Sequence, residues 1–148
     1  MNRSHRLQPV KEFIRRQEDE VAKAMNRAAE ELRQAQAQLE ALQQFRRQYS
    51  GELPRQGGAV RGALLHEYRA FLANLGRAIQ EQEEKLVRLR QRHAELERSW
   101  RQVHCRHRGV EKFQHKLERQ EIHALERRLQ NELDDRSASR FRKPKPKW

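Results

Sequence analysis

A heptad repeat of apolar residues runs through most of the sequence and leaves few folds open. In the first third of the chain, two series alternate at three- and four-residue spacing, which is the pattern of a coiled coil. The first series is apolar or aromatic throughout and comprises Leu7, Ile14, Val21, Ala28, Ala35, Leu42 and Tyr49. The second series contains Met25, Leu32 and Leu39, and the positions at its two ends are polar: Lys11, Glu18 and Arg46. Because Pro9 is tolerated in a first turn, the repeat predicts a helix over about residues 9–49.

Loop-forming residues then interrupt the repeat before it resumes. Ser50, Gly51, Pro54, Gly57 and Gly58 predict a loop over about residues 50–61, and the renewed repeat predicts a second helix over about 62–135. One series of this helix reads Leu65, Leu72, Ile79, Leu86, His93, Trp100 and His107, and the other Tyr68, Leu75, Gln82, Leu89, Leu96, Val103, Val110 and Leu117. The last apolar stripe is displaced, which we interpret as a stutter of the coiled coil, and comprises Ile122, Leu125, Leu129 and Leu133.

Two amphipathic helices joined by a short loop fold back on each other, because each stripe needs a partner. The expected fold class is therefore all-α, a long antiparallel two-helix coiled coil (an α-hairpin) over residues 1–135 with a longer second helix. Such a hairpin is a rod with a single seam and no interior cavity for a substrate. Residues 136–148 carry six bases and no acid, with Pro144 and Pro146 among them, so we expect a disordered basic tail.

Composition agrees with a rod and excludes several classes of protein. Of the 148 residues, 35% are hydrophobic and 36% are charged, which is too polar for a compact α/β enzyme or a β-sandwich. No apolar run approaches the roughly 18 residues of a spanning helix. The chain has one cysteine and no secretory stretch after Met1, so we expect a reducing, cytoplasmic location without a disulfide framework.

The net charge of +12 is concentrated in two places. The tail holds half of it, and residues 85–119 have eleven bases against four acids. Such a stretch could bind phosphates, but Trp100 and Phe113 lie on or beside the seam and form no stacking platform. We therefore expect the basic stretch to dock on proteins and keep a basic coiled-coil protein that binds nucleic acid as the alternative of another class.

The histidines and the cysteine form no recognisable reactive motif. His104 and His107 could share a helical face, but Cys105 is the only thiol and no second ligand cluster has zinc-finger spacing. No acid completes a nucleophilic arrangement around Cys105, and Gly57-Gly58 lacks the context of a phosphate loop. The expectation is a protein without enzymatic activity, metal, cofactor or small-molecule substrate.

Aromatic residues gather around the loop. Phe45 and Tyr49 precede it, and Tyr68 and Phe71 follow it, so antiparallel pairing brings all four to one end. The tyrosines belong to the seam, whereas Phe45 and Phe71 do not. This leaves two interpretations open, a core that widens near the loop or an exposed anchor patch for a protein partner.

Three segments resemble the FliJ family of flagellar export proteins. They are QAQLEALQQFRRQY at 36–49, EYRAFLANLGRAIQEQEEKL at 67–86 and ERSWRQ at 97–102. The most specific feature is their ordered pattern, F/Y-x3-Y, a loop, Y-x2-F-[LI]-x2-L-x2-AI and then S-W. The resemblance covers most of residues 10–135, including the loop position and the longer second helix.

The resemblance implies a non-enzymatic stalk component of the flagellar type III export apparatus, in the cytoplasm and held at the inner membrane through its partners. The implied partners are the hexameric export ATPase, the cytoplasmic domain of the export gate and emptied export chaperones, and residues 1–30 and 105–135 would enter the ATPase ring. We expect Arg88, Arg92 and Arg101 to provide a basic face for the ATPase. The equivalent stalk of an injectisome type III secretion system is the nearest alternative. The implied gate patch comprises Gln38, Leu42, Phe45, Tyr49, Phe71, Leu75, Ala78 and Gln82, with Phe45 in place of a frequent tyrosine.

Overall fold

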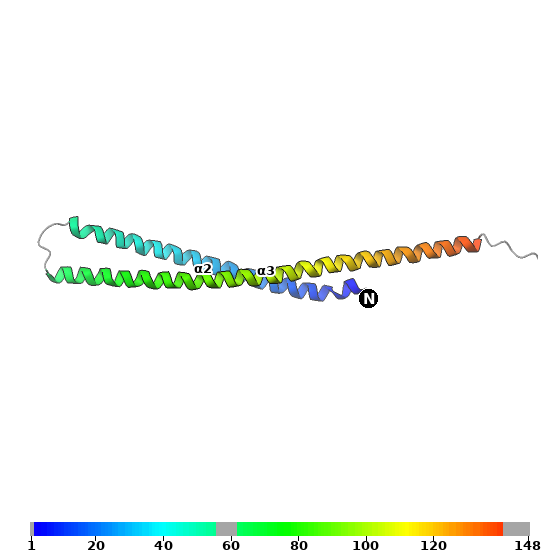
Figure 1. The fold of residues 1–148 in the computed structure, drawn as a ribbon, viewed down its shortest axis with the longest axis horizontal. Coiled ribbons are helices and arrows are strands. Elements are labelled where there is room, and N and C mark those ends of the chain that lie inside the picture. Colours follow the sequence, from blue (N-terminus) through cyan, green and yellow to red (C-terminus); the bar gives the residue numbers. More distant parts are fainter. Residues whose placement is uncertain (1, 56–61, 141–148) are drawn as a thin grey trace, which may run out of the picture. The chain divides into compact units, whose positions relative to one another are not determined.

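A computed structural model describes residues 2–55 and 62–140 of the chain, and three helices account for nearly all of them: α1 (Arg3–Arg6), α2 (Gln8–Arg55) and α3 (Gly62–Arg140). The chain divides into two compact units, one formed by Met1–Glu18 with Val103–Trp148 and the other by Asp19–Gln102. In each unit a segment of α2 lies beside a segment of α3 that runs in the opposite direction (Figure 1). This pairing confirms the all-α fold class with two long packed helices. Within the described residues, no helix is both long enough and apolar enough to span a bilayer.

The helix ends differ from those expected. α2 begins at Gln8, so Pro9 lies in its first turn, where its missing N–H costs no helical hydrogen bond. α2 also continues past its expected end at Tyr49, as far as Arg55. The Ser50 hydroxyl donates a hydrogen bond to the Arg46 carbonyl at 2.5 Å, so the polar side chain of Ser50 has a partner within the helix.

The second helix and the tail also need a corrected boundary. α3 includes residues 136–140, which we had expected in the tail, because no helix-breaking residue occurs before Pro144. The rest of the expected loop, 56–61, and the rest of the expected tail, 141–148, lie outside the described residues.

The heptad positions form the seam between α2 and α3. Among the described residues, four apolar side chains are buried at 2–3% exposure, namely Ala28, Ala35, Ile79 and Leu86. The other apolar positions of both repeats, as far as Leu117, are half-buried. Positions facing away from the seam are exposed. The core is therefore a single line of side chains, as a two-helix pairing dictates.

The N-terminal end of the chain is attached to α3 through polar groups. The Ser4 amide and hydroxyl donate to the Glu121 carboxylate at 3.0 and 2.6 Å, and Gln114 Nε2 donates to the Ser4 carbonyl at 3.2 Å and to Gln8 Oε1 at 3.0 Å. Ser4 and Gln114 are each only 7% exposed, so these bonds satisfy buried polar groups.

The expected stutter beyond Phe113 is not seen in the packing. Gln114, Leu117 and Glu121 continue the two heptad series of α3, and all three are buried or half-buried. The stripe that suggested a stutter is instead exposed to solvent: Ile122, Leu125, Leu129 and Leu133 are 53–58% exposed. In the described part of the chain, α1 reaches only as far as Glu121, so α3 has no neighbouring helix along this stripe.

Substitutions of two adjacent residues of α3, Leu86 and Val87, test whether packing in the seam provides most of the free energy of unfolding. Leu86→Ala should lower the free energy of unfolding by about 2–4 kcal/mol, because it leaves a cavity in the seam. Val87→Ala should change it by less than about 0.5 kcal/mol, since Val87 is 52% exposed. Chemical denaturation followed by circular dichroism measures both, and equal effects would contradict the seam assignment.

The contact between Ser4 and Glu121 should depend on pH. Hydrogen bonds from the Ser4 hydroxyl and amide, with a smaller one from the Arg3 backbone, lower the pKa of the Glu121 carboxyl, and partial loss of hydration opposes them. A lowered pKa means that the contact stabilises the folded state above the ordinary value of 4.5 and is lost as the pH falls through the lowered pKa. The NMR shift of the Ser4 amide should therefore titrate with a midpoint below 4.5. Glu121→Gln should abolish that titration, and its persistence would assign it to another group.

Candidate protein-docking site

Three aromatic rings form one contact group in the unit made of residues 19–102. The Phe45 and Tyr49 rings stack with centroids 5.9 Å apart and planes 6° from parallel, and Phe71 of α3 meets Tyr49 edge to face at 5.2 Å. Tyr49 is half-buried, whereas Phe45 and Phe71 are 50% and 44% exposed. The group is therefore anchored in the seam by Tyr49 and open to solvent on its outer side. We call these three residues the aromatic group.

The other residues of the expected gate patch follow along the same side of the helix pair. Gln38 lies one heptad from Phe45, and Ala78 one heptad from Phe71, so each pair projects from one side of its helix. Gln82 Nε2 donates to Gln38 Oε1 at 3.1 Å and to the Ala35 carbonyl at 3.0 Å. Leu42 and Leu75 are half-buried in the seam between these pairs. The helix pairing thus brings Phe71 of α3 against Tyr49 of α2, and Gln82 of α3 against Gln38 of α2.

A shallow groove of about 130 Å³ extends this surface beyond Gln38. Sequence reasoning named Ala35 and Leu89 only as heptad positions and did not single out a groove, because only the pairing of α2 with α3 shows which side chains lie opposite one another. The small side chain of Ala35 on the seam marks a place where the helices can approach closely. The groove is lined by Glu31, Gln34, Ala35, Gln38, Lys85 and Leu89.

The three arginines expected on one basic face do not share a face. At 100° per residue, Arg88 and Arg92 lie about 40° apart around α3, whereas Arg92 and Arg101 are about 180° apart. Arg101 also pairs with Glu97 at 2.7 Å. Arg88 and Arg92 are both exposed, so only these two remain as neighbours on one side of the helix.

The histidines find a partner that the sequence did not single out. In the unit that includes residues 1–18, Nδ1 of His104 lies 2.6 Å from one carboxylate oxygen of Glu18, and Nδ1 of His107 lies 2.8 Å from the other. Both Nδ1–H groups can donate to the one carboxylate, which accounts for a charged residue at a seam position. Among residues 2–55 and 62–140, no three histidine, cysteine or acidic side chains are arranged to hold a metal ion, and Cys105 is exposed.

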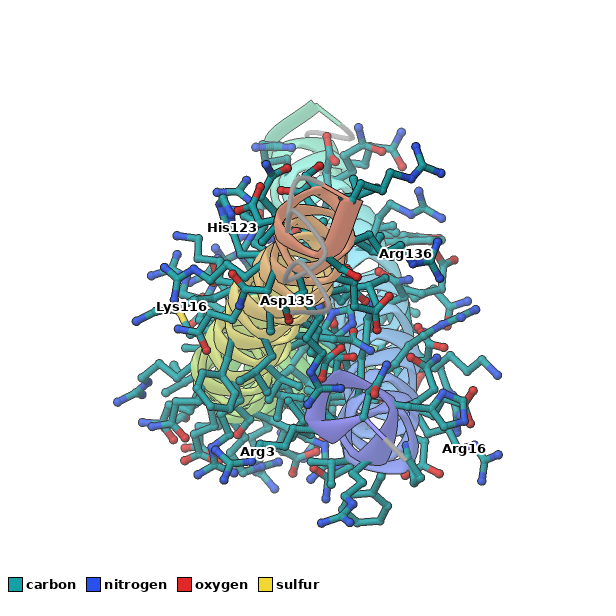
Figure 2. All side chains as sticks on the ribbon, turned by 90° about the vertical axis from the view of Figure 1, so that its right-hand side faces the viewer. Arg3, Arg16, Lys116, His123, Asp135 and Arg136 are labelled. Atoms are coloured by element: carbon teal, nitrogen blue, oxygen red, sulfur yellow. The ribbon has the colours of Figure 1, made fainter. Side chains whose placement is uncertain are left out.

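Charged side chains project outward from both helices of this unit. In Figure 2, Arg3, Arg16 and Lys116 point away from the helices into solvent. Lys11 and Glu111 form an ion pair across the two helices at 3.8 Å. These charged side chains therefore lie around the seam, which in this unit also contains the contact of Glu18 with the two histidines. The exposed rings of the aromatic group are the feature of the described residues best suited to binding a protein.

Comparison with known proteins gives the family. The family model described as "Flagellar FliJ protein" matches residues 3–146, which is nearly the whole chain. No curated protein and no solved structure matched the chain. The family match agrees with the helix pairing and with the segments around the aromatic group. The chain therefore belongs to the FliJ family and is a component of the flagellar type III export apparatus.

Proposed function

We propose that the chain is a non-enzymatic stalk that docks on the export gate through the aromatic group and its flanking residues, Gln38, Leu42, Leu75, Ala78 and Gln82. The observation that carries this proposal is the half-exposed state of Phe45 and Phe71 around a seam-anchored Tyr49. Rings that are held in place by packing yet open to solvent lose little entropy on binding and are typical anchors of protein interfaces. The partner of this surface is the cytoplasmic domain of the gate.

The proposal includes two further partners. Arg88 and Arg92 pair with carboxylates of the hexameric export ATPase, into which residues 1–30 and 105–135 insert. Emptied export chaperones are escorted by the same stalk. All of this takes place on the cytoplasmic side of the inner membrane, where the chain is held through its partners. Family membership and the length of α2 and α3 support a stalk, and exposed arginines suit bidentate contacts to carboxylates.

Replacing both exposed rings tests the gate contact. Phe45→Ala with Phe71→Ala should weaken binding to the cytoplasmic domain of the gate at least about tenfold, because two interface anchors are lost. Isothermal titration calorimetry measures the affinity. Phe13→Ala with Phe113→Ala is the matched control, since these rings are 59% and 52% exposed but lie outside the aromatic group. Equal losses in both double variants, or none in the first, would reject the docking surface.

Charge reversal tests the ATPase contact. Arg88→Glu with Arg92→Glu should reduce capture of the ATPase hexamer and make the remaining binding less sensitive to salt, because two ion pairs are lost. Arg101→Glu, about 180° away around α3 from Arg92, should leave binding close to that of the unchanged protein. A pull-down across a range of salt concentrations distinguishes the two. If Arg101→Glu proves the more damaging change, another side of α3 meets the ATPase.

A further inference from the structure

The apolar stripe near the end of α3 has no neighbouring helix in the described part of the chain. Its four residues are 53–58% exposed and comprise Ile122, Leu125, Leu129 and Leu133. Four such residues at helical spacing form a continuous apolar strip, whereas single exposed leucines are common. α1 contacts α3 at Glu121 through Ser4, so the open stretch of α3 runs over residues 122–140 and is about 27 Å long.

Charged side chains of both signs border the stripe. Residues 122–140 contain four acids and four bases, so this stretch has no net charge while His123 is neutral. Three of the eight face away, about 120–160° around α3 from Leu129 at the centre of the stripe: Arg127, Asp134 and Asp135. The five on the side of the stripe are all exposed and comprise Glu126, Arg128, Glu132, Arg136 and Arg140.

The order of these five charges changes sign along the helix. Glu126 and Glu132 flank the centre of the stripe at about 60° on opposite sides. Arg128 lies at about 100°, on the same side as Glu132. Arg136 and Arg140 follow at about 20°, so they continue the stripe itself. An acidic flank is thus followed by a basic end, a pattern that is complementary to itself when the direction is reversed.

We propose that a second copy of this chain covers the stripe, with the two α3 segments antiparallel. Leu129 of each copy lies opposite Leu133 of the other. This alignment places residue 122 opposite residue 140, so the two open stretches overlap over their whole length. The contact is isologous, and every interaction in it therefore occurs twice.

The flanking charges match in this alignment. Glu126 lies opposite Arg136 of the second copy. Arg128 lies within about one turn of Glu132 of the second copy, on the same side of the contact. The two Glu132 side chains approach each other in the middle of the contact, where the two Arg128 side chains balance them. Each copy thus supplies both partners of two ion pairs.

The end of the stretch also has a place to bind. Arg140 of the second copy lies opposite Ile122, where a shallow hollow of about 560 Å³ opens on α3. The lining of this hollow includes Glu118 and Glu121 against one base, Arg128. Two carboxylates around one guanidinium favour the approach of a second guanidinium.

Other occupants fit the charges less well. A parallel second copy in register would bring Glu126 against Glu126 and Arg136 against Arg136. Anionic membranes and nucleic acids are attracted by net positive charge, which residues 122–140 do not have. A uniformly basic or acidic segment would meet like charges at one end of the stripe.

The inference concerns the free chain and does not depend on the proposed contacts with the gate and the ATPase. It adds one consequence to them. Because residues 105–135 are proposed to enter the ATPase ring, the dimer and the ATPase-bound chain would be alternative states of the same segment.

Sedimentation velocity of the full-length chain tests the association. Cys105→Ser provides the background, because it excludes dimers linked through the exposed thiol. The average mass should rise from one chain to two as protein concentration increases, with a dissociation constant in the micromolar range because the overlap is small. Leu129→Ser should raise that constant at least about tenfold, since two leucine contacts are lost. Val87→Ser is the matched control, because Val87 is 52% exposed but lies outside residues 122–140.

Exchange of charges tests the alignment. Glu126→Arg and Arg136→Glu should each weaken self-association about tenfold, because each change creates two pairs of like charge. An equimolar mixture of these two variants should associate as strongly as the unchanged chain, since the mixed dimer restores both pairs. Asp134→Arg makes the same change of charge about 140° from Leu129 and should have little effect. Circular dichroism establishes that each variant keeps its helicity.

Four results would overturn the proposal. One is a mass of one chain at every protein concentration up to about 1 mM. Another is self-association that Leu129→Ser leaves unchanged, which would assign it to another surface. The third is a mixture of the two charge variants that associates no better than either alone, which would contradict the alignment. The last is a chain that stays monomeric and binds vesicles of phosphatidylglycerol unless Leu129→Ser is introduced, which would assign the stripe to a membrane surface.

Discussion

The contact of α2 with α3 along one heptad seam is the constraint on which the rest of the structure depends. A single line of apolar side chains stabilises the pair but encloses no volume, so every functional group must lie on an outer surface. The aromatic group follows from this arrangement. Tyr49 belongs to the seam, and the neighbouring Phe45 and Phe71 lie beside it, where they pack on one face and meet water on the other.

Polar residues at seam positions add specificity to an otherwise repetitive contact. Gln82 reaches the backbone of Ala35, Glu18 accepts from two histidines, and Gln114 reaches Ser4 and Gln8. A shift of either helix by one heptad would leave these buried or half-buried polar groups without their partners. Leaving them unpaired costs more free energy than the difference in apolar contacts between neighbouring alignments. Such residues weaken the seam locally but favour one alignment of α2 with α3 over its neighbours.

The sequence predicts the seam well because periodicity is a local property. The heptad series through Leu117 packs as expected, and Phe45 and Phe71, which lie off the two series, are exposed. Properties that depend on which residues of the other helix lie opposite a side chain could not be predicted from the sequence. Glu18 is an unremarkable acid until the pairing places His104 and His107 against it. The stripe from Ile122 to Leu133 has a seam-like spacing, yet it is exposed, because in the described part of the chain α1 begins beside Glu121 and no helix lies along the stripe.

Chemical crosslinking within residues 19–102 tests the central claim of an antiparallel pairing in this alignment. In a Cys105→Ser chain, cysteines at Gln38 and Gln82, whose side chains meet at 3.1 Å, should be joined within one molecule by a short bifunctional maleimide. Cysteines at Gln38 and Arg98 should not, because Arg98 lies about 24 Å farther along α3. Efficient crosslinking of the second pair, or crosslinking of the first only between molecules, would contradict the pairing of α2 with α3 described above.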